Sequence, residues 1–278
     1  MKEENSTNLS DAQIDIRQNH RKQMWSQMMA VSRPDSRFHW DFSSFIPDFV
    51  GSEDCAQQLL DLPGFRDGGE LFITPDNSTE ATRVLAINIG RPFTMTTYGI
   101  GRGFLRLDPR NVPSGEARYA ATLDGMDRYA EPVSLAKMAA GPRFSMLVTG
   151  GSAVSRNGVR FGKGHGYFDL EWALLSEIGT TDAATQIADI VHDCQVVDDD
   201  LEGADHDVPV DWIVTPTRTL HVPDTGRQTG RVRWELLDRS PLASIPPVRE
   251  LRERLNDAGR DHTPHDNSRS EVEFNERS

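Results

Sequence analysis

Short apolar runs alternate along the chain with segments that have the spacing of helices. The apolar runs cover residues 70–74, 92–97, 144–148, 186–191 and 210–214, and the helical segments between them include residues 79–90 and 167–178. Strands that are joined in this way by helices form parallel sheets covered on both faces. We therefore predict an α/β fold with an open, mostly parallel sheet and helices on both faces, a three-layer, Rossmann-like arrangement. In such sheets ligands bind outside the carboxyl ends of the strands.

The two ends of the chain lack this pattern. Residues 1–10 are polar, and residues 256–278 are charged and almost without apolar side chains. Such segments cannot bury enough apolar surface to fold, so both are expected to be disordered. The chain has 278 residues, and we expect one α/β domain over residues 11–255.

Further helices are expected at both ends of this domain. Residues 11–30 have apolar side chains at helical spacing, and Ser52 is a plausible N-cap for a helix over residues 53–62. Gly179 stands where a glycine commonly follows the end of a helix. A short amphipathic helix is expected to end near residue 255.

Charge and cysteine content narrow the possible partners and compartment. The chain has 30 Lys and Arg against 43 Asp and Glu, a formal net charge of -13, which argues against a nucleic-acid-binding surface. Its two cysteines are far apart in sequence, so we expect no disulfide framework and a reducing, cytoplasmic location. No leader and no apolar run of about 18 residues is apparent, so no membrane partner is expected.

The segment 158–169, GVRFGKGHGYFD, has the composition of a phosphate-binding loop. Gly162, Gly164 and Gly166 allow close backbone approach and positive φ, so that successive N–H groups can surround an anion. A helix that begins directly after them adds a partial positive charge, and Arg160 and Lys163 add full charges. No Gly-Lys-Ser/Thr occurs, so this is no Walker A loop, and no strand is expected to lead directly into it, unlike a Rossmann fingerprint. The alternative is a flexible, solvated surface loop.

Two acids and two arginines could complete such a site. Asp169 falls in the first turn of the following helix, where it either complements the helix dipole or binds Mg²⁺ beside phosphates. Asp211 precedes an apolar strand and is the second candidate metal ligand. Arg17 and Arg21 are four residues apart and share a helix face. They form either a solvated stripe or a clamp on phosphates.

A histidine- and acid-rich segment could instead form a zinc site. His192, Cys194 and His206 could bind zinc, although their spacing matches no common zinc motif. Cys194 is more readily explained as a small buried residue than as a nucleophile.

Segment 158–169 resembles the signature of the 5-formyltetrahydrofolate cyclo-ligase family, also called methenyltetrahydrofolate synthetase. That signature reads Gly-x-Arg-hydrophobic-Gly-basic-Gly-Lys-Gly-Tyr-Tyr-Asp. The resemblance extends over about residues 16–219. Three blocks, IPDFVG at 46–51, VHDCQVV at 191–197 and HDVPVDWIVTPT at 206–217, are similar to a divergent branch of methenyltetrahydrofolate synthetase domain-containing proteins.

The resemblance implies an activity and a set of site residues. The family's enzymes use ATP and Mg²⁺ to convert 5-formyltetrahydrofolate into 5,10-methenyltetrahydrofolate, with ADP and phosphate as the other products. The implied ATP-binding residues are Arg17, Arg21, Arg160, Gly162, Lys163, Gly164, His165, Gly166 and Tyr167. Lys163 and Tyr167 are the implied catalytic residues, Phe168 contacts the substrate, and Asp169 and Asp211 are the metal ligands. The expected protein is a monomer or a homodimer.

The chain departs from the family at the substrate side of the signature. Phe168 replaces the second tyrosine, and His165 replaces a lysine, so that one charge depends on pH. Residues 74–79 stand where the family has a glutamate-containing folate turn, and no matching glutamate is evident. Two alternatives therefore stay open: an ATP-dependent enzyme acting on a non-folate metabolite, such as a thiamine-related one, and a non-catalytic regulator that binds nucleotide or folate.

Overall fold

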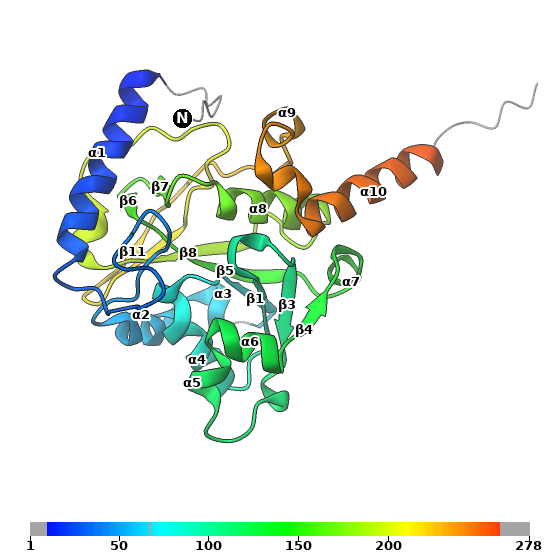
Figure 1. The fold of residues 1–278 in the computed structure, drawn as a ribbon, viewed down its shortest axis with the longest axis horizontal. Helices are drawn as coiled ribbons and strands as arrows, with labels where there is room; N and C mark the ends of the chain where they lie inside the picture. The colour runs from blue at the N-terminus through cyan, green and yellow to red at the C-terminus, as the bar shows by residue number, and fades with distance from the viewer. Residues whose placement is uncertain (1–9, 67, 262–278) are drawn as a thin grey trace, which may run out of the picture.

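A mixed sheet of eight strands forms the centre of the protein. The structure, a computed structural model, describes residues 10–66 and 68–261 (Figure 1). The strand order is β11-β10-β8-β5-β1-β2-β3-β4, and the five strands from β10 to β2 are parallel. The strands are β1 Glu70–Ile73, β2 Phe93–Thr96, β3 Phe104–Leu107, β4 Glu131–Val133, β5 Phe144–Gly150, β8 Gln186–Ile190, β10 Trp212–Val214 and β11 Thr219–His221. The predicted mostly parallel sheet is confirmed, with antiparallel strands β3, β4 and β11 added at its edges.

Helices cover both faces of this sheet, as predicted. One face packs against α1 Asp11–Met28, α2 Ser52–Gln58, α3 Pro63–Arg66, α4 Glu80–Asn88, α5 Ala117–Ala120 and α6 Leu123–Tyr129. The other packs against α7 Leu135–Ala139, α8 Tyr167–Glu177, α9 Trp234–Leu237 and α10 Pro246–Asp261. Strand residues alternate between the two cores: in β1, Leu71 and Ile73 join the first and Phe72 the second. This alternation produces the three layers.

Short 3-10 turns complete the order of elements. They are η1 Leu59–Asp61, η2 Asn77–Thr79, η3 Tyr98–Ile100, η4 Pro109–Asn111, η5 Asp193–Gln195 and η6 Pro241–Ser244.

A second, three-stranded sheet was not predicted. Strands β6 Ala153–Ser155, β7 Arg160–Phe161 and β9 Val196–Val197 pair in the order β7-β6-β9. Strand β7 lies inside the Gly-rich segment, so the expectation that no strand leads into the loop was wrong. Met24 of α1 packs on this small sheet with Phe161. Figure 1 shows α1 lying along the side of the molecule that carries β6 and β7.

Several helix boundaries differ from the predicted ones. Helix α2 begins at Ser52 and is capped by Gly51 in the left-handed region, so Ser52 is not the N-cap. Gly179 follows α8 with φ 73°, and the N–H of Thr180 bonds to the carbonyl of Leu175 at 3.0 Å, which confirms the predicted glycine stop.

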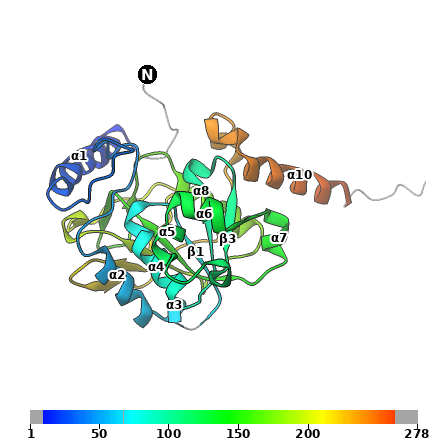
Figure 2. The same ribbon diagram turned by 60° about the horizontal axis from the view of Figure 1, so that its bottom comes forward.

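Helix α10 continues to Asp261, beyond the end expected at residue 255. It projects away from the body in both views (Figures 1 and 2). Of the two tails that were expected to be disordered, residues 1–9 and 262–278 lie outside the described residues. Within the described ranges, no helix combines the length and apolar character needed to cross a membrane.

Candidate functional site

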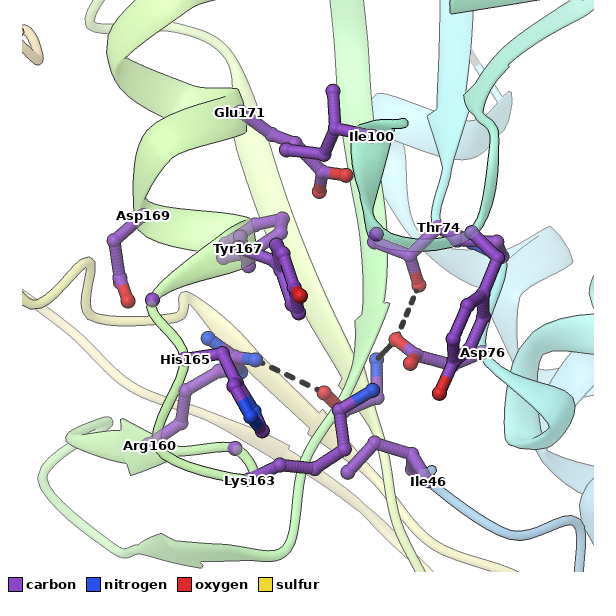
Figure 3. A pocket seen from close by; sticks show the side chains of 17 residues that line it. Ile46, Thr74, Asp76, Ile100, Arg160, Lys163, His165, Tyr167, Asp169 and Glu171 are labelled. Carbon is purple, nitrogen blue, oxygen red and sulfur yellow. Dashed lines mark hydrogen bonds between the residues drawn. The ribbon is translucent and has the colours of Figure 1, made fainter. Parts of the chain in front are cut away.

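A pocket opens at the carboxyl ends of the central parallel strands, between the sheet and the first turn of α8 (Figure 3). Thr74 directly follows β1, Gly150 ends β5, and η3 follows β2 by one residue. The Gly-rich loop closes the remaining side. The pocket therefore occupies the edge of the sheet at which an open α/β fold binds ligands.

The backbone of the Gly-rich loop depends on its glycines. Gly164 has φ 105° and Gly166, the N-cap residue of α8, has φ 67°. Residues other than glycine rarely adopt these backbone angles. The loop thereby turns from β7 directly into the N-terminus of an 11-residue helix, where the helix dipole and unpaired N–H groups favour an anion.

Two arginines reach this loop from α1. Arg21 donates from Nε to the carbonyl of Gly162 at 2.8 Å, and its guanidinium lies 5.2 Å from the ring centre of Phe161. Arg17 is 8% exposed and donates to Asp207 and to the carbonyl of Glu202. Burial, and then the charge of Arg17, lowers the pKa of Arg21 to about 10. The two arginines therefore lie against the loop, and the alternative of a solvated stripe was wrong.

The cations of the loop lie against aromatic rings. Arg160 is buried, donates to the carbonyl of Gly150 at 3.1 Å and lies 4.7 Å from the ring centre of Phe168. Lys163 Nζ lies 5.1 Å from the ring centre of Tyr98 and 5.7 Å from that of Tyr167. Within the described residues, Arg21, Arg160 and Lys163 have no carboxylate within salt-bridge distance. Three cations near one loop without a paired acid favour an anionic ligand.

The remaining loop residues form the pocket wall. The ring of His165 stacks on that of Tyr167, with centroids 5.4 Å apart and an interplanar angle of 18°. Both residues line the pocket. Phe168, the predicted substrate contact, also lines it, but its ring is 4% exposed and belongs to the core.

Asp169 is half-buried at the loop side of the pocket and has a second acid near it. Its Oδ1 accepts the N–H of Val208 at 3.0 Å. Burial raises its pKa, and the negative charge of Asp207 raises it further, whereas Arg160 lowers it. Asp207 accepts hydrogen bonds from Arg17 and from the N–H of Ala204. Two neighbouring acids beside cations form a pair that a divalent cation could bridge to a phosphate.

Asp211, the second predicted metal ligand, lies elsewhere. It precedes β10, and its Oδ2 accepts the N–H of Ile187 at 2.7 Å and Nη1 of Arg227 at 2.8 Å. Ile187 is near the start of the parallel strand β8, so Asp211 lies toward the amino ends of the strands and does not line the pocket. The structure therefore does not place Asp211 beside Asp169 as predicted; the acid whose charge acts on Asp169 is Asp207, four residues earlier in the chain.

The zinc alternative finds no support in the described part of the chain. His192 Nδ1 is 3.2 Å from Cys194 Sγ, but no group of three His, Cys, Asp or Glu side chains within residues 10–66 and 68–261 is arranged to hold a metal ion. Burial raises the pKa of the Cys194 thiol, which disfavours a nucleophilic thiolate. Both cysteines are free.

Two buried acids near the pocket were missed. Glu171 lines the pocket, is 2% exposed and accepts a hydrogen bond from Thr96, and burial raises its pKa to about 8. Asp189 on β8 is fully buried, and burial raises its pKa to about 7. A methyl group on Gly151 would lie 2.8 Å from Asp189 Oδ2. The available signal was an acid inside an otherwise apolar buried segment, in FDLEWALL and in QIADI.

The cavity itself is small, about 60 Å³. Small-molecule sites usually offer roughly 300–1,000 Å³. Lys163 and His165 occupy the side of the pocket nearest the loop (Figure 3). Their side chains must therefore move outward when a ligand of nucleotide size binds.

The buried carboxyl of Asp189 predicts a pH-dependent loss of stability. Because its pKa rises from 3.8 to about 7 on folding, the folded chain binds more protons than the unfolded chain between these values. The free energy of unfolding of the wild type, relative to Asp189→Asn, should fall as pH rises from roughly 4 to 7. Denaturant titrations across this range measure it.

Asp182→Asn is the control for that measurement. Its exposed carboxylate pairs with Arg143, which lowers its pKa, so its contribution changes only below this range. A flat difference between wild type and Asp189→Asn from pH 4 to 7 would show that Asp189 is ionised in the folded protein.

Comparison with known proteins gives a family for this fold and site. The sequence profile described as the 5-formyltetrahydrofolate cyclo-ligase family matches residues 13–216. A methenyltetrahydrofolate synthase domain-containing protein of Homo sapiens is 32% identical over 250 residues, which cover 89% of this chain and 64% of that protein. The protein of the same name from Mus musculus is 31% identical over 253 residues, covering 90% and 67%. The chain thus spans about two thirds of the length of these relatives.

A solved structure is also similar. The NMR structure of Aquifex aeolicus 5,10-methenyltetrahydrofolate synthetase has a TM-score of 0.46 and 16% identity, and the match covers 78% of this chain and 98% of that one. A likeness at this level carries no information about individual residues. The profile match over most of the domain is sufficient by itself: the chain belongs to the 5-formyltetrahydrofolate cyclo-ligase family.

Proposed function

We propose that this protein is an ATP- and Mg²⁺-dependent cyclo-ligase of the cytoplasm that converts 5-formyltetrahydrofolate, or a related formylated pterin, into 5,10-methenyltetrahydrofolate, ADP and phosphate. One observation carries the proposal. Arg21, Arg160 and Lys163 surround a glycine loop at the N-terminus of α8, without a directly paired carboxylate among the described residues. Such a concentration of positive charge fits a polyphosphate.

The ATP phosphates would lie over the loop Gly162–Gly166. Backbone N–H groups at the start of α8, together with Lys163 and Arg21, would neutralise their charge. In this pose Arg160 lies beneath the loop, held by the carbonyl of Gly150. Tyr167 lines the same wall and would contact the reacting groups.

Asp169 and Asp207 fit a magnesium ion. Burial first, and then the negative charge of Asp207, raises the pKa of Asp169, and a divalent cation would offset both effects. Mg²⁺ usually takes one or two carboxylates and completes its coordination with phosphate oxygens and water. When bound, it would neutralise charge that develops on the phosphoryl oxygens.

The reaction needs positioning more than covalent chemistry from the protein. The formyl oxygen attacks the γ-phosphorus, the bond to the bridging oxygen breaks, and ADP leaves. N10 of the folate then attacks the formyl carbon and loses its proton, and the carbon–oxygen bond breaks to release phosphate. Phosphorylation is required because the formamide oxygen alone is a poor leaving group. The pocket would hold the formyl oxygen in line with the γ-phosphate beside Lys163.

The wild-type chain should form the methenyl product when it is mixed with ATP, Mg²⁺ and 5-formyltetrahydrofolate. The product has a long-wavelength absorbance band that the substrate lacks, so spectrophotometry follows it directly. Reactions without ATP should stay flat. No product, while a known cyclo-ligase works in the same buffer, would refute the reaction.

Lys163→Ala should weaken ATP binding without affecting the fold. Loss of a charge-assisted contact to phosphate costs about 1.5–3 kcal/mol, so the Kd for ATP should rise by at least about tenfold. Because Lys163 is a half-buried loop residue, its substitution should change stability by no more than about 1 kcal/mol. Calorimetry measures the Kd, and Lys137→Ala, an exposed lysine on α7, is the matched control. Equal ATP affinity in the two variants would contradict the role of Lys163.

A second candidate is an ATP-dependent enzyme that acts on a non-folate metabolite. The turn 74–79 favours it, because Asp76 already accepts hydrogen bonds from Thr74 and from the N–H of Gly150. Asn77 in the same turn donates to Asp35 outside the pocket. ATP hydrolysis stimulated by another metabolite, and not by 5-formyltetrahydrofolate, would favour this candidate.

A further inference from the structure

Glu171 has a free oxygen in the interior of the pocket. It lies one helical turn after Tyr167 on α8, so both side chains share the face that lines the pocket. Its Oε1 accepts the hydroxyl of Thr96 at the end of β2. Its Oε2 is buried and has no hydrogen-bond partner among the residues that the structure describes. A buried polar atom without a partner is destabilising.

Another buried acid shows how the fold otherwise satisfies such a group. Glu70 on β1 is 8% exposed and accepts from Thr94, which lies two residues before Thr96 on β2. Unlike Glu171, it also accepts from Arg106 at 2.6 Å and so has a protein cation as partner. In the described part of the chain Glu171 has no salt bridge. A cation or N–H donor beside Glu171 Oε2 would therefore come from a bound ligand.

The loop after β2 holds the wall opposite Glu171 in a strained conformation. Ile100 has φ 57°, in the left-handed region that β-branched residues avoid, and is 1% exposed. Such strained conformations are concentrated at functional sites. Figure 3 shows the Ile100 side chain beside the Glu171 carboxylate, and Tyr167 faces the same space. An apolar and an aromatic wall next to one carboxylate suit a flat ring with a polar edge.

The cations of the pocket and Glu171 lie apart. Arg160 and Lys163 lie at the Gly-rich loop, whereas Glu171 lies one turn into α8 beside Ile100 (Figure 3). A phosphate is attracted to the two cations at the loop. If ATP occupies the loop, as the proposed function requires, the group that meets Glu171 belongs to the second substrate.

We propose that Glu171 is a specificity-determining residue whose Oε2 accepts a hydrogen bond from an N–H of a flat nitrogen heterocycle of the 2-aminopyrimidine type, to which pterins belong. Thr96 is the positioning residue, because its hydroxyl fixes the plane of the carboxyl group. Without this acceptor a buried N–H of the ligand would lack a partner, which lowers affinity by roughly 5- to 150-fold. This inference rests on the proposed function only in placing ATP at the loop.

The test compares Glu171→Met with Glu70→Met by calorimetry in the presence of a non-hydrolysable ATP analogue. The probes are 5-formyltetrahydrofolate and unsubstituted pterin. Methionine keeps the length of the side chain and removes the acceptor. Glu171→Met should raise the Kd of any probe that the wild type binds by at least about fivefold and leave the Kd of the ATP analogue within twofold. Glu70→Met should change neither, and Thr96→Val should weaken the probe less than Glu171→Met.

Three outcomes would overturn the inference. The first is that Glu171→Met binds the probe within twofold of the wild-type affinity. The second is that Glu171→Met and Glu70→Met lose equal affinity for the probe. The third is that the wild type binds neither probe at roughly 1 mM. Failure of the proposed reaction is separate from these. Pterin binding that depends on Glu171, without methenyl product, would refute the reaction and support the inference. Product formation by the wild type, with probe affinity unchanged in Glu171→Met, would support the reaction and refute the inference.

Discussion

The docking of helix α1 onto the Gly-rich loop, through Arg17 and Arg21, is the contact on which the candidate site depends. An unpaired charge inside a protein costs several kcal/mol, so buried arginines need partners. Arg17 pairs with Asp207, whereas Arg21 contacts the carbonyl of Gly162 and the ring of Phe161. The small sheet makes this docking possible, because Met24 and Phe161 pack together beneath the loop. The fold thereby holds a partly compensated positive cluster next to the N-terminus of α8.

The acids near the pocket differ in their surroundings. Asp169 and Asp207 lie beside the cations, where we propose that a metal ion binds. Glu171 lies toward β2 with one oxygen unsatisfied within the described residues. Asp189 lies beneath Gly151 at the carboxyl half of β8. Placing so many carboxyls around buried arginines costs stability, and proteins retain such arrangements mainly at functional sites.

Local patterns in the sequence predicted most of the fold and the loop side of the site. Alternating apolar runs gave the parallel sheet, and helical spacing placed Arg17 and Arg21 on one face. The choice between Asp207 and Asp211 could not be made in this way, because both precede the same strand and only the register of β10 on β8 separates them. The two-residue strands β7 and β9 are too short to show periodicity. Glu171 was missed because a glutamate within a helix is ordinary, and its burial depends on tertiary packing.

The crystal structure of the protein with Mn²⁺ and a non-hydrolysable ATP analogue tests the central claim most directly. Manganese has a strong anomalous signal and replaces magnesium at oxygen-rich sites. The account predicts the triphosphate over Gly162–Gly166 within reach of Lys163 and Arg21, with manganese bound by Asp169 or Asp207. Triphosphate density away from the loop, or manganese at Asp211, would contradict it.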